Sequence, residues 1–218
     1  MILSISRFLQ HPLARVTLIL LVVVAASQAP VPFPWKLPAI ALVVLVLVWL
    51  ETRRMSAIGL GRHSPAATVL WGAALAFGAV VVIGEVIQPL LEEAIGLKTD
   101  YSAFGGLAGN LPAALSLILY AMLSAAVGEE VALRGFLLHQ FDALLSQTLR
   151  WASVILAACV FGALHAPQGW SGIIATSLVG LLFGWAFFRS GRNLWALILA
   201  HALTDVCGVM MIYFGRYA

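Results

Sequence analysis

The sequence is poor in charged side chains, and this shortage indicates the class of protein before any motif is considered. Only 10% of its 218 residues are Asp, Glu, Lys or Arg, whereas ordinary globular domains contain about 25%. Apolar residues make up 62%, and the mean hydropathy is +1.03. This composition predicts an integral membrane protein. The net charge of +3 comes from basic residues scattered at the ends of apolar runs, which gives no indication of nucleic-acid binding.

Cysteine is also scarce, and several hydrolase motifs are missing. Cys159 and Cys207 both lie in apolar segments, and we interpret them as small buried hydrophobic residues rather than a disulfide or a metal pair. The sequence contains no His-Glu-x-x-His and no Gly-x-Ser-x-Gly, and it also lacks a Gly-x-Gly-Asp pair. These absences exclude a zincin helix, a serine-hydrolase elbow and an intramembrane aspartyl protease of that type.

Apolar runs predict an all-α, polytopic transmembrane bundle of about seven helices. No strand pattern is present, and helices are one of only two backbone structures that can cross a bilayer. A crossing helix needs about 20 residues to span the hydrocarbon core. The expected helices occupy residues 14–29, 37–50, 66–88, 111–139, 149–166, 171–189 and 193–214.

The distribution of lysine and arginine predicts a cytoplasmic N-terminus, because cytoplasmic loops are enriched in these residues. Arg134 is left out of the count because it lies within an apolar run. Eight basic residues then fall inside: Arg7, Arg15, Arg53, Arg54, Arg62, Arg150, Arg189 and Arg192. Three fall outside: Lys36, Lys98 and Arg216. This orientation also puts the stretch GEEVALRGF (128–136) toward the cytoplasmic side, and seven helices would leave the C-terminus outside.

The first unusual polar group is that stretch, which stands at the end of an apolar run. Ionisable groups at membrane depth are rare and usually face a cavity or a partner. Glu130 and Arg134 are four residues apart in the order that favours an ion pair on a helix. Glu129 points about 100° away from Glu130 by helix periodicity, so it has no evident partner.

Two further apolar runs carry histidine. His165 ends one run, with Phe161 one turn before it, and His201 lies near mid-membrane with Asp205 one turn later. A lone buried histidine is often structural, and we interpret His139 and the ETRR segment (51–54) as interfacial or solvated. Polar groups on three separate helices, however, suggest one shared site.

These residue types permit three kinds of chemistry. A carboxylate near an imidazole can act as a general base toward water, while further donors stabilise an oxyanion. Glu129, His165, His201 and Asp205 are also acceptable zinc ligands. A proton-linked transporter would use intramembrane acids and histidines as well.

The segments EEVALRG, FGALH and HALTD resemble, in order and spacing, the three motifs of the CAAX-protease and bacteriocin-processing (CPBP) family. Those motifs are Glu-Glu-x-x-x-Arg, Phe-x-x-x-His and His-x-x-x-Asn/Asp. The resemblance covers roughly residues 105–214 and is to type II CAAX endopeptidases, which are α-helical intramembrane proteases. We therefore divide one integral membrane domain into N-terminal helices (1–104) and CPBP-type catalytic helices (105–218).

The resemblance implies a role for each matching residue. Glu129 would be the general base, and His165 would help to hold the water. His201 and Asp205 would form the oxyanion side, with Glu130, Arg134 and Phe161 in support. Prenyl-processing members have Asn where this chain has Asp205, and ionised Asp cannot donate a hydrogen bond.

We therefore expect an intramembrane endopeptidase that cleaves a peptide near the cytoplasmic face of the bacterial inner membrane. Its partners would be a peptide or membrane-protein substrate and the lipid bilayer, without nucleic acid. We favour a mechanism without a cofactor, and zinc is the alternative. A non-proteolytic scaffold or regulator that keeps the fold, or a proton-linked transporter, are the other functions that this sequence permits.

Overall fold

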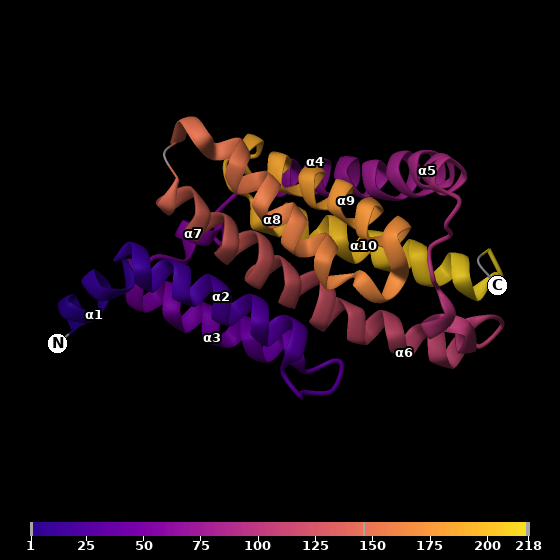
Figure 1. Ribbon diagram of the computed structural model, residues 1–218, viewed down its shortest axis with the longest axis horizontal. Coiled ribbons are helices and arrows are strands. Elements are labelled where there is room, and N and C mark those ends of the chain that lie inside the picture. The colour runs from indigo at the N-terminus through magenta and orange to yellow at the C-terminus, as the bar shows by residue number, and fades with distance from the viewer. Residues whose placement is uncertain (1, 146, 217–218) are drawn as a thin grey trace.

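The computed structural model describes residues 2–145 and 147–216, and within these ranges the chain is helical without any strand (Figure 1). The helices are α1 (Ile2–Leu9), α2 (Pro12–Gln28), α3 (Lys36–Thr52), α4 (Pro65–Phe77), η2 (Gly78–Ile87), α5 (Gln88–Ile95), α6 (Leu111–Ala121), η4 (Met122–Phe136), α7 (Leu137–Leu144), α8 (Arg150–Leu164), α9 (Gly169–Arg189) and α10 (Leu194–Tyr213). Short 3-10 turns are η1 (Met55–Ile58), η3 (Ser102–Leu107), η5 (Gln147–Leu149) and η6 (Ala166–Gln168). The all-α prediction is confirmed, and each of the seven expected ranges is helical.

Within the described residues, four helical rods are long and apolar enough to cross a bilayer: Pro65–Ile95, Leu111–Leu144, Ala166–Arg189 and Leu194–Tyr213. Two of them are compound, since α4, η2 and α5 run on without a break, as do α6, η4 and α7. The apolar helices α2 and α8 are shorter. These spans make the chain an integral membrane protein, in agreement with its composition.

Caps at the first turn fix where several of these rods begin. The Ser64 side chain accepts from the Ala67 amide, and the next residue is a proline, which tolerates the first turn because its missing N–H would have no partner there. Asn110 and Asn193 cap α6 and α10 in the same way. Both compound rods contain π-type winding, in η2 and η4, and such winding is rare and frequently occurs at functional sites.

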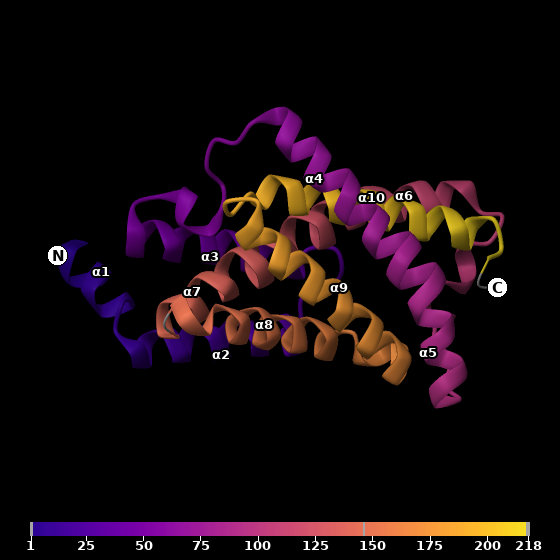
Figure 2. The same cartoon turned by 90° about the horizontal axis from the view of Figure 1, so that it is seen from above.

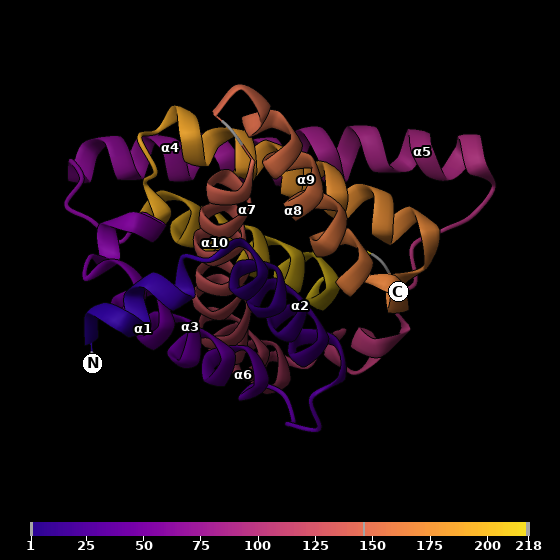
Figure 3. The same ribbon diagram turned by 60° about the vertical axis from the view of Figure 1, so that its left-hand side comes forward.

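The rod Leu111–Leu144 runs through the middle of the molecule, with α2 and α3 along one side of it (Figure 1), and α10 passes behind it in the view of Figure 3. From above, the rod of α4, η2 and α5 crosses α10 and runs beside α9 (Figure 2). Close approach depends on glycine: a Cβ on Gly128 would lie only 2.8 Å from the Leu37 Cβ. Gly180 packs on Ala158 between α8 and α9 in the same manner, as is usual for small residues between membrane helices.

Two expectations about polar positions are wrong. Cys159 and Cys207 are exposed rather than buried. The ETRR segment and His139 are not simply solvated, because Glu51 is only 3% exposed and is the centre of a buried network. Arg15 Nη2 lies 2.5 Å from Glu51 Oε1, and His139 Nε2 lies 3.3 Å from the same oxygen.

Gln140 completes this network, which we call the anchor cluster (Arg15, Glu51, His139 and Gln140). Its Nε2 donates to Glu51 Oε2 at 3.0 Å, and its Oε1 accepts from Arg15 Nη1 at 2.6 Å. The anchor cluster joins α2, α3 and α7, which are distant in sequence. It therefore fixes the N-terminal helices against the end of the central rod.

Candidate active site

The carboxylate pair lies in the middle of the central rod, not at the end of a helix. The sequence suggested that apolar structure stops near GEEVALRGF, but the helix continues from Leu111 to Leu144. Glu129 is 18 residues after its start and 15 before its end. At 1.5 Å per residue, the carboxylates lie roughly 20 Å or more from either end of the rod.

Glu130 is fully buried and engaged by two positive or proton-donating groups. Its Oε1 lies 3.2 Å from Arg134 Nη1 and 2.7 Å from His201 Nδ1. The Arg134 guanidinium stacks 3.5 Å above the Phe161 ring, which is a favourable cation–π arrangement. The sequence spacing predicted the Glu130–Arg134 pair, and the structure contains it.

Glu129 has a different environment from its neighbour. Its side chain faces a cavity that Glu130 does not reach, and among the described residues its buried Oε2 has no hydrogen-bond partner. A buried polar atom without a partner loses its hydration without compensation, which costs about 1–3 kcal/mol. Such a group is expected where water or a substrate is its partner during function.

His165 follows the last residue of α8 and lines the same cavity. Its Nδ1 lies 2.8 Å from the Phe161 carbonyl oxygen, so we assign the proton of a neutral ring to Nδ1. The ring also packs on the edge of Phe161, with centroids 4.6 Å apart. With Nδ1 donating, Nε2 is left as the acceptor of this imidazole.

His201 lies between two carboxylates. Besides the contact of Nδ1 with Glu130, its Nε2 is 3.7 Å from Asp205 Oδ1, and Asp205 Oδ2, like Oε2 of Glu129 and of Glu130, is buried without a partner in the described chain. Sequence reasoning paired His201 with Asp205 but missed the closer contact with Glu130. No spacing rule could show that contact, because it joins η4 to α10.

One cavity of about 370 Å³ brings the expected site residues together, and it is lined by Glu129, Phe161, His165, Phe183, His201 and Asp205 among others. This volume lies within the range of small-molecule and peptide sites, about 300–1,000 Å³. Glu130 and Arg134 are outside its lining and support it from behind. The residues predicted from three separate motifs therefore share one site.

The possible zinc ligands do not converge in this arrangement. Among the residues that the structure describes, no three His, Cys, Asp or Glu side chains are placed to hold one metal ion. His201 Nδ1 is hydrogen-bonded to Glu130 Oε1, so only Nε2 of this ring is available to a ligand. The geometry thus gives no metal centre from which a reaction step could be derived.

The fold and this cavity define a helical membrane protein with a carboxylate–imidazole site in its interior. Residues 111–207 match the family model described as Rce1-like, type II CAAX prenyl endopeptidase Rce1-like. This match confirms the resemblance for that part of the chain, and it includes all three motifs. No curated protein and no solved structure matches the chain.

Proposed function

We propose that this protein is an intramembrane endopeptidase that hydrolyses a peptide bond with a water molecule activated by Glu129. The observation that carries the proposal is the buried, unpartnered Oε2 of Glu129 in a cavity that it shares with His165 and His201. The match to an endopeptidase family supports the same reaction class. The N-terminus would be cytoplasmic and the membrane the bacterial inner membrane.

The reaction needs one base, one water-holding group and one oxyanion donor. Glu129 would take a proton from the water while His165 Nε2 accepts a hydrogen bond from it. The water oxygen would form a bond to the scissile carbonyl carbon, and the carbonyl oxygen would become an oxyanion that accepts a hydrogen bond from Nε2 of a doubly protonated His201, whose Nδ1 donates to Glu130. Glu129 would then return its proton to the leaving amine as the C–N bond breaks.

Glu130 and Arg134 would hold the two histidines in place and would not take part in the reaction themselves. Glu130 accepts from His201 Nδ1 at 2.7 Å, which fixes the orientation of that ring and directs Nε2 toward the cavity side occupied by Asp205. Arg134 in turn pairs with Glu130 and stacks on Phe161, whose carbonyl oxygen orients His165. A single arginine thus supports both histidines.

A scaffold or a proton-linked transporter remain the competing functions. A scaffold has no use for Glu129 Oε2, a buried atom that destabilises the fold while it has no partner. A transporter would move protons through these groups without cleaving a peptide, and the match to an endopeptidase family gives it no support. Both observations favour the hydrolase.

The test is to reconstitute the purified wild-type protein and its Glu129→Gln variant in lipid nanodiscs. Each protein is incubated with a pool of membrane peptides that has not been treated with any other protease. New peptide termini are then identified by mass spectrometry. We expect new termini with wild type and almost none with Glu129→Gln. Equal sets of new termini from the two proteins would refute the role of Glu129 as general base. An absence of new termini from both proteins would favour the scaffold function.

A further inference from the structure

The lining of the active-site cavity is confined to one half of the bundle. On α10 the lining begins at His201 and continues to Ile212, close to the end of the helix, whereas none of its residues 194–200 takes part. On α9 it extends from Gly172, near the start, to Phe183, and residues 184–189 do not contribute. The cavity therefore runs from the middle of these helices to one end.

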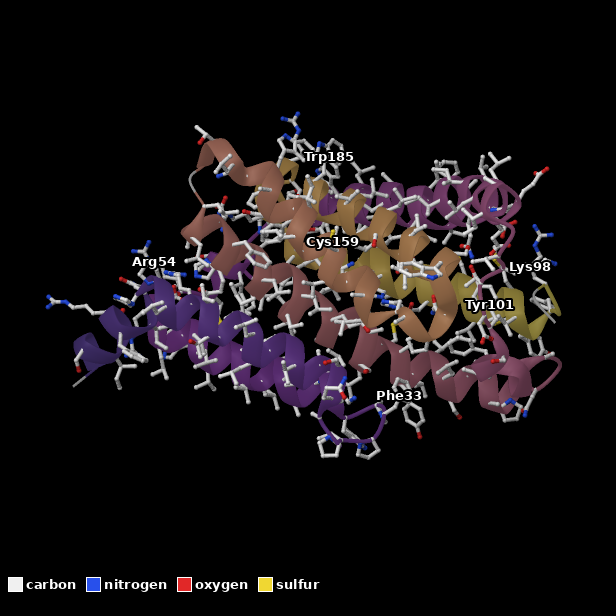
Figure 4. All side chains as sticks on the ribbon, in the orientation of Figure 1. Phe33, Arg54, Lys98, Tyr101, Cys159 and Trp185 are labelled. Carbon is white, nitrogen blue, oxygen red and sulfur yellow. The ribbon has the colours of Figure 1, made fainter. Side chains whose placement is uncertain are left out.

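The central rod and the loops identify that end. The rod contributes residues from Leu117 to Glu129 and nothing after Glu129. Tyr101 and Phe104, which lie in the connection before α6, also line the cavity. Figure 4 shows Tyr101 and Lys98 together at this end of the molecule and Arg54 at the opposite end.

A second cavity of about 170 Å³ lies on the same side of the site. It shares Phe104, His165 and Gln168 with the first cavity and is also lined by Asp100 and Ser102. Asp100 is exposed. The polar loops around residues 98–104 and 165–168 thus surround a route from solvent to His165.

The opposite end is closed by apolar side chains and carries the arginines. Phe136, Phe187 and Leu197 lie beyond the site in that direction, and each is 0% exposed. Asp142 of α7 forms salt bridges with Arg150 at the start of α8 and with Arg192 just before α10, so it joins these helices at this end. Eight basic residues stand at the helix ends on this side: Arg7 in α1, Arg15 in the first turn of α2, Arg53 and Arg54 after α3, Arg62 before α4, Arg150 at the start of α8, Arg189 at the end of α9 and Arg192 before α10 (Figure 1).

This asymmetry sets the side from which a substrate enters. Basic residues near the ends of membrane helices remain on the cytoplasmic side, so the arginine-rich end is the cytoplasmic one. We infer that the active-site cavity opens on the non-cytoplasmic side, and that the enzyme acts on exported polypeptides or on the outer segments of membrane proteins. The substrate class in this inference rests on the proposed function. The side of the membrane on which the cavity opens does not.

It also replaces the expectation of cleavage near the cytoplasmic face. That expectation assumed that the Glu129 motif stands close to the cytoplasmic end of its helix. In the structure 15 residues separate Glu129 from Leu144, and the whole of the cavity lies on the other side of the motif.

Thiol labelling can test the sidedness without any substrate. Gly208 lines the cavity, and a Cβ at this position would meet no atom within 4 Å, so Gly208→Cys introduces a reactive group without a clash. The exposed Cys159 and Cys207 are first replaced by alanine. Lys98→Cys and Arg54→Cys, at exposed positions of the two ends, serve as matched controls in the same background.

Intact cells are treated with a membrane-impermeant maleimide, and inverted membrane vesicles are treated in parallel. We expect Gly208→Cys and Lys98→Cys to react in cells, and Arg54→Cys to react only in inverted vesicles. Reaction of Gly208→Cys together with Arg54→Cys would overturn the inference, as would its failure to react from either side while both controls react.

A second experiment separates this result from the catalytic proposal. Adding Glu129→Gln to the Gly208→Cys protein should leave its labelling pattern unchanged, since accessibility needs no general base. If Glu129→Gln kept full activity, the proposed function would fail while the labelling still located the cavity. If the labelling reversed sides while Glu129→Gln was inactive, only the sidedness would be wrong.

Discussion

The anchor cluster and the active-site cluster are both buried and use similar residues, but they differ in how completely their atoms are paired. In the anchor cluster both Glu51 carboxylate oxygens have partners, from Arg15, His139 and Gln140. In the site, Glu129 Oε2, Glu130 Oε2 and Asp205 Oδ2 are buried without a hydrogen bond among the described residues. The second cluster borders the 370 Å³ cavity, and no residue of the anchor cluster lines that cavity.

The comparison shows which property distinguishes function from architecture here. Burial of charge alone does not, because Glu51 is as deeply buried as many catalytic carboxylates, at 3% exposure. Buried polar groups are nearly always hydrogen-bonded in native proteins, and each exception needs an explanation. Unpaired oxygens directed at a cavity have such an explanation in the water or peptide that occupies it.

The largest effect is expected at the unpaired carboxylate itself. Glu129→Gln keeps the shape of the side chain but removes the base, so activity should fall at least about 100-fold, the lower end of general-base effects. The unfolding temperature in detergent should stay at the wild-type value, because Glu129 Oε2 has no partner to lose. Wild-type turnover would remove Glu129 from the mechanism.

The next effect should appear in both activity and stability. Arg134→Ala leaves Glu130 buried without its ion-pair partner, and breaking a buried pair typically costs about 3–5 kcal/mol of unfolding free energy. Glu130→Gln should destabilise as well, since it leaves Arg134 unpaired. Thermal unfolding beside peptide-cleavage rates measures both, and unchanged unfolding temperatures in the two variants would refute the supporting role.

The anchor cluster should respond in stability alone. Arg15→Ala removes an ion pair with Glu51 and a hydrogen bond to Gln140, each contributing on the order of 2 kcal/mol. The turnover of the protein that remains folded should not change, because no anchor residue lines the cavity. Arg54→Ala, an exposed arginine at the same end, is the matched control and should alter neither quantity. Loss of turnover in folded Arg15→Ala would mean that the two clusters are coupled.

Local sequence signals predicted much of the fold and part of the site. Apolar runs located all seven helical ranges, since a membrane helix must be apolar along its length. The four-residue spacing of Glu130 and Arg134 predicted their ion pair, which is a contact within one helix. The motifs selected Glu129, His165, His201 and Asp205, and the structure assembles these side chains around one cavity.

Contacts between helices were not predictable in the same way. The Glu130–His201 hydrogen bond and the Arg15–Glu51 pair join residues 71 and 36 positions apart, and no periodicity relates them. The ETRR segment was assigned to the interface because it follows an apolar run, yet packing of α1, α2 and α7 covers Glu51. The helix expected over residues 111–139 extends to Leu144, so Glu129 lies deeper than its place at the end of an apolar run suggested.

The smallest effect is expected at Asp205, and its sign distinguishes the mechanisms. Without a metal, the unpaired Asp205 Oδ2 adds negative charge beside the developing oxyanion and opposes the transition state. Asp205→Asn supplies an amide donor of the same size, so activity at neutral pH should hold or rise. If Asp205 instead binds zinc, the amide is a poorer ligand, and metal content and activity should fall together. The metal-free and zinc mechanisms are distinguished by assaying purified wild-type and Asp205→Asn proteins side by side and measuring the metal content of both. A joint loss of metal and activity would reject the metal-free mechanism that we favour.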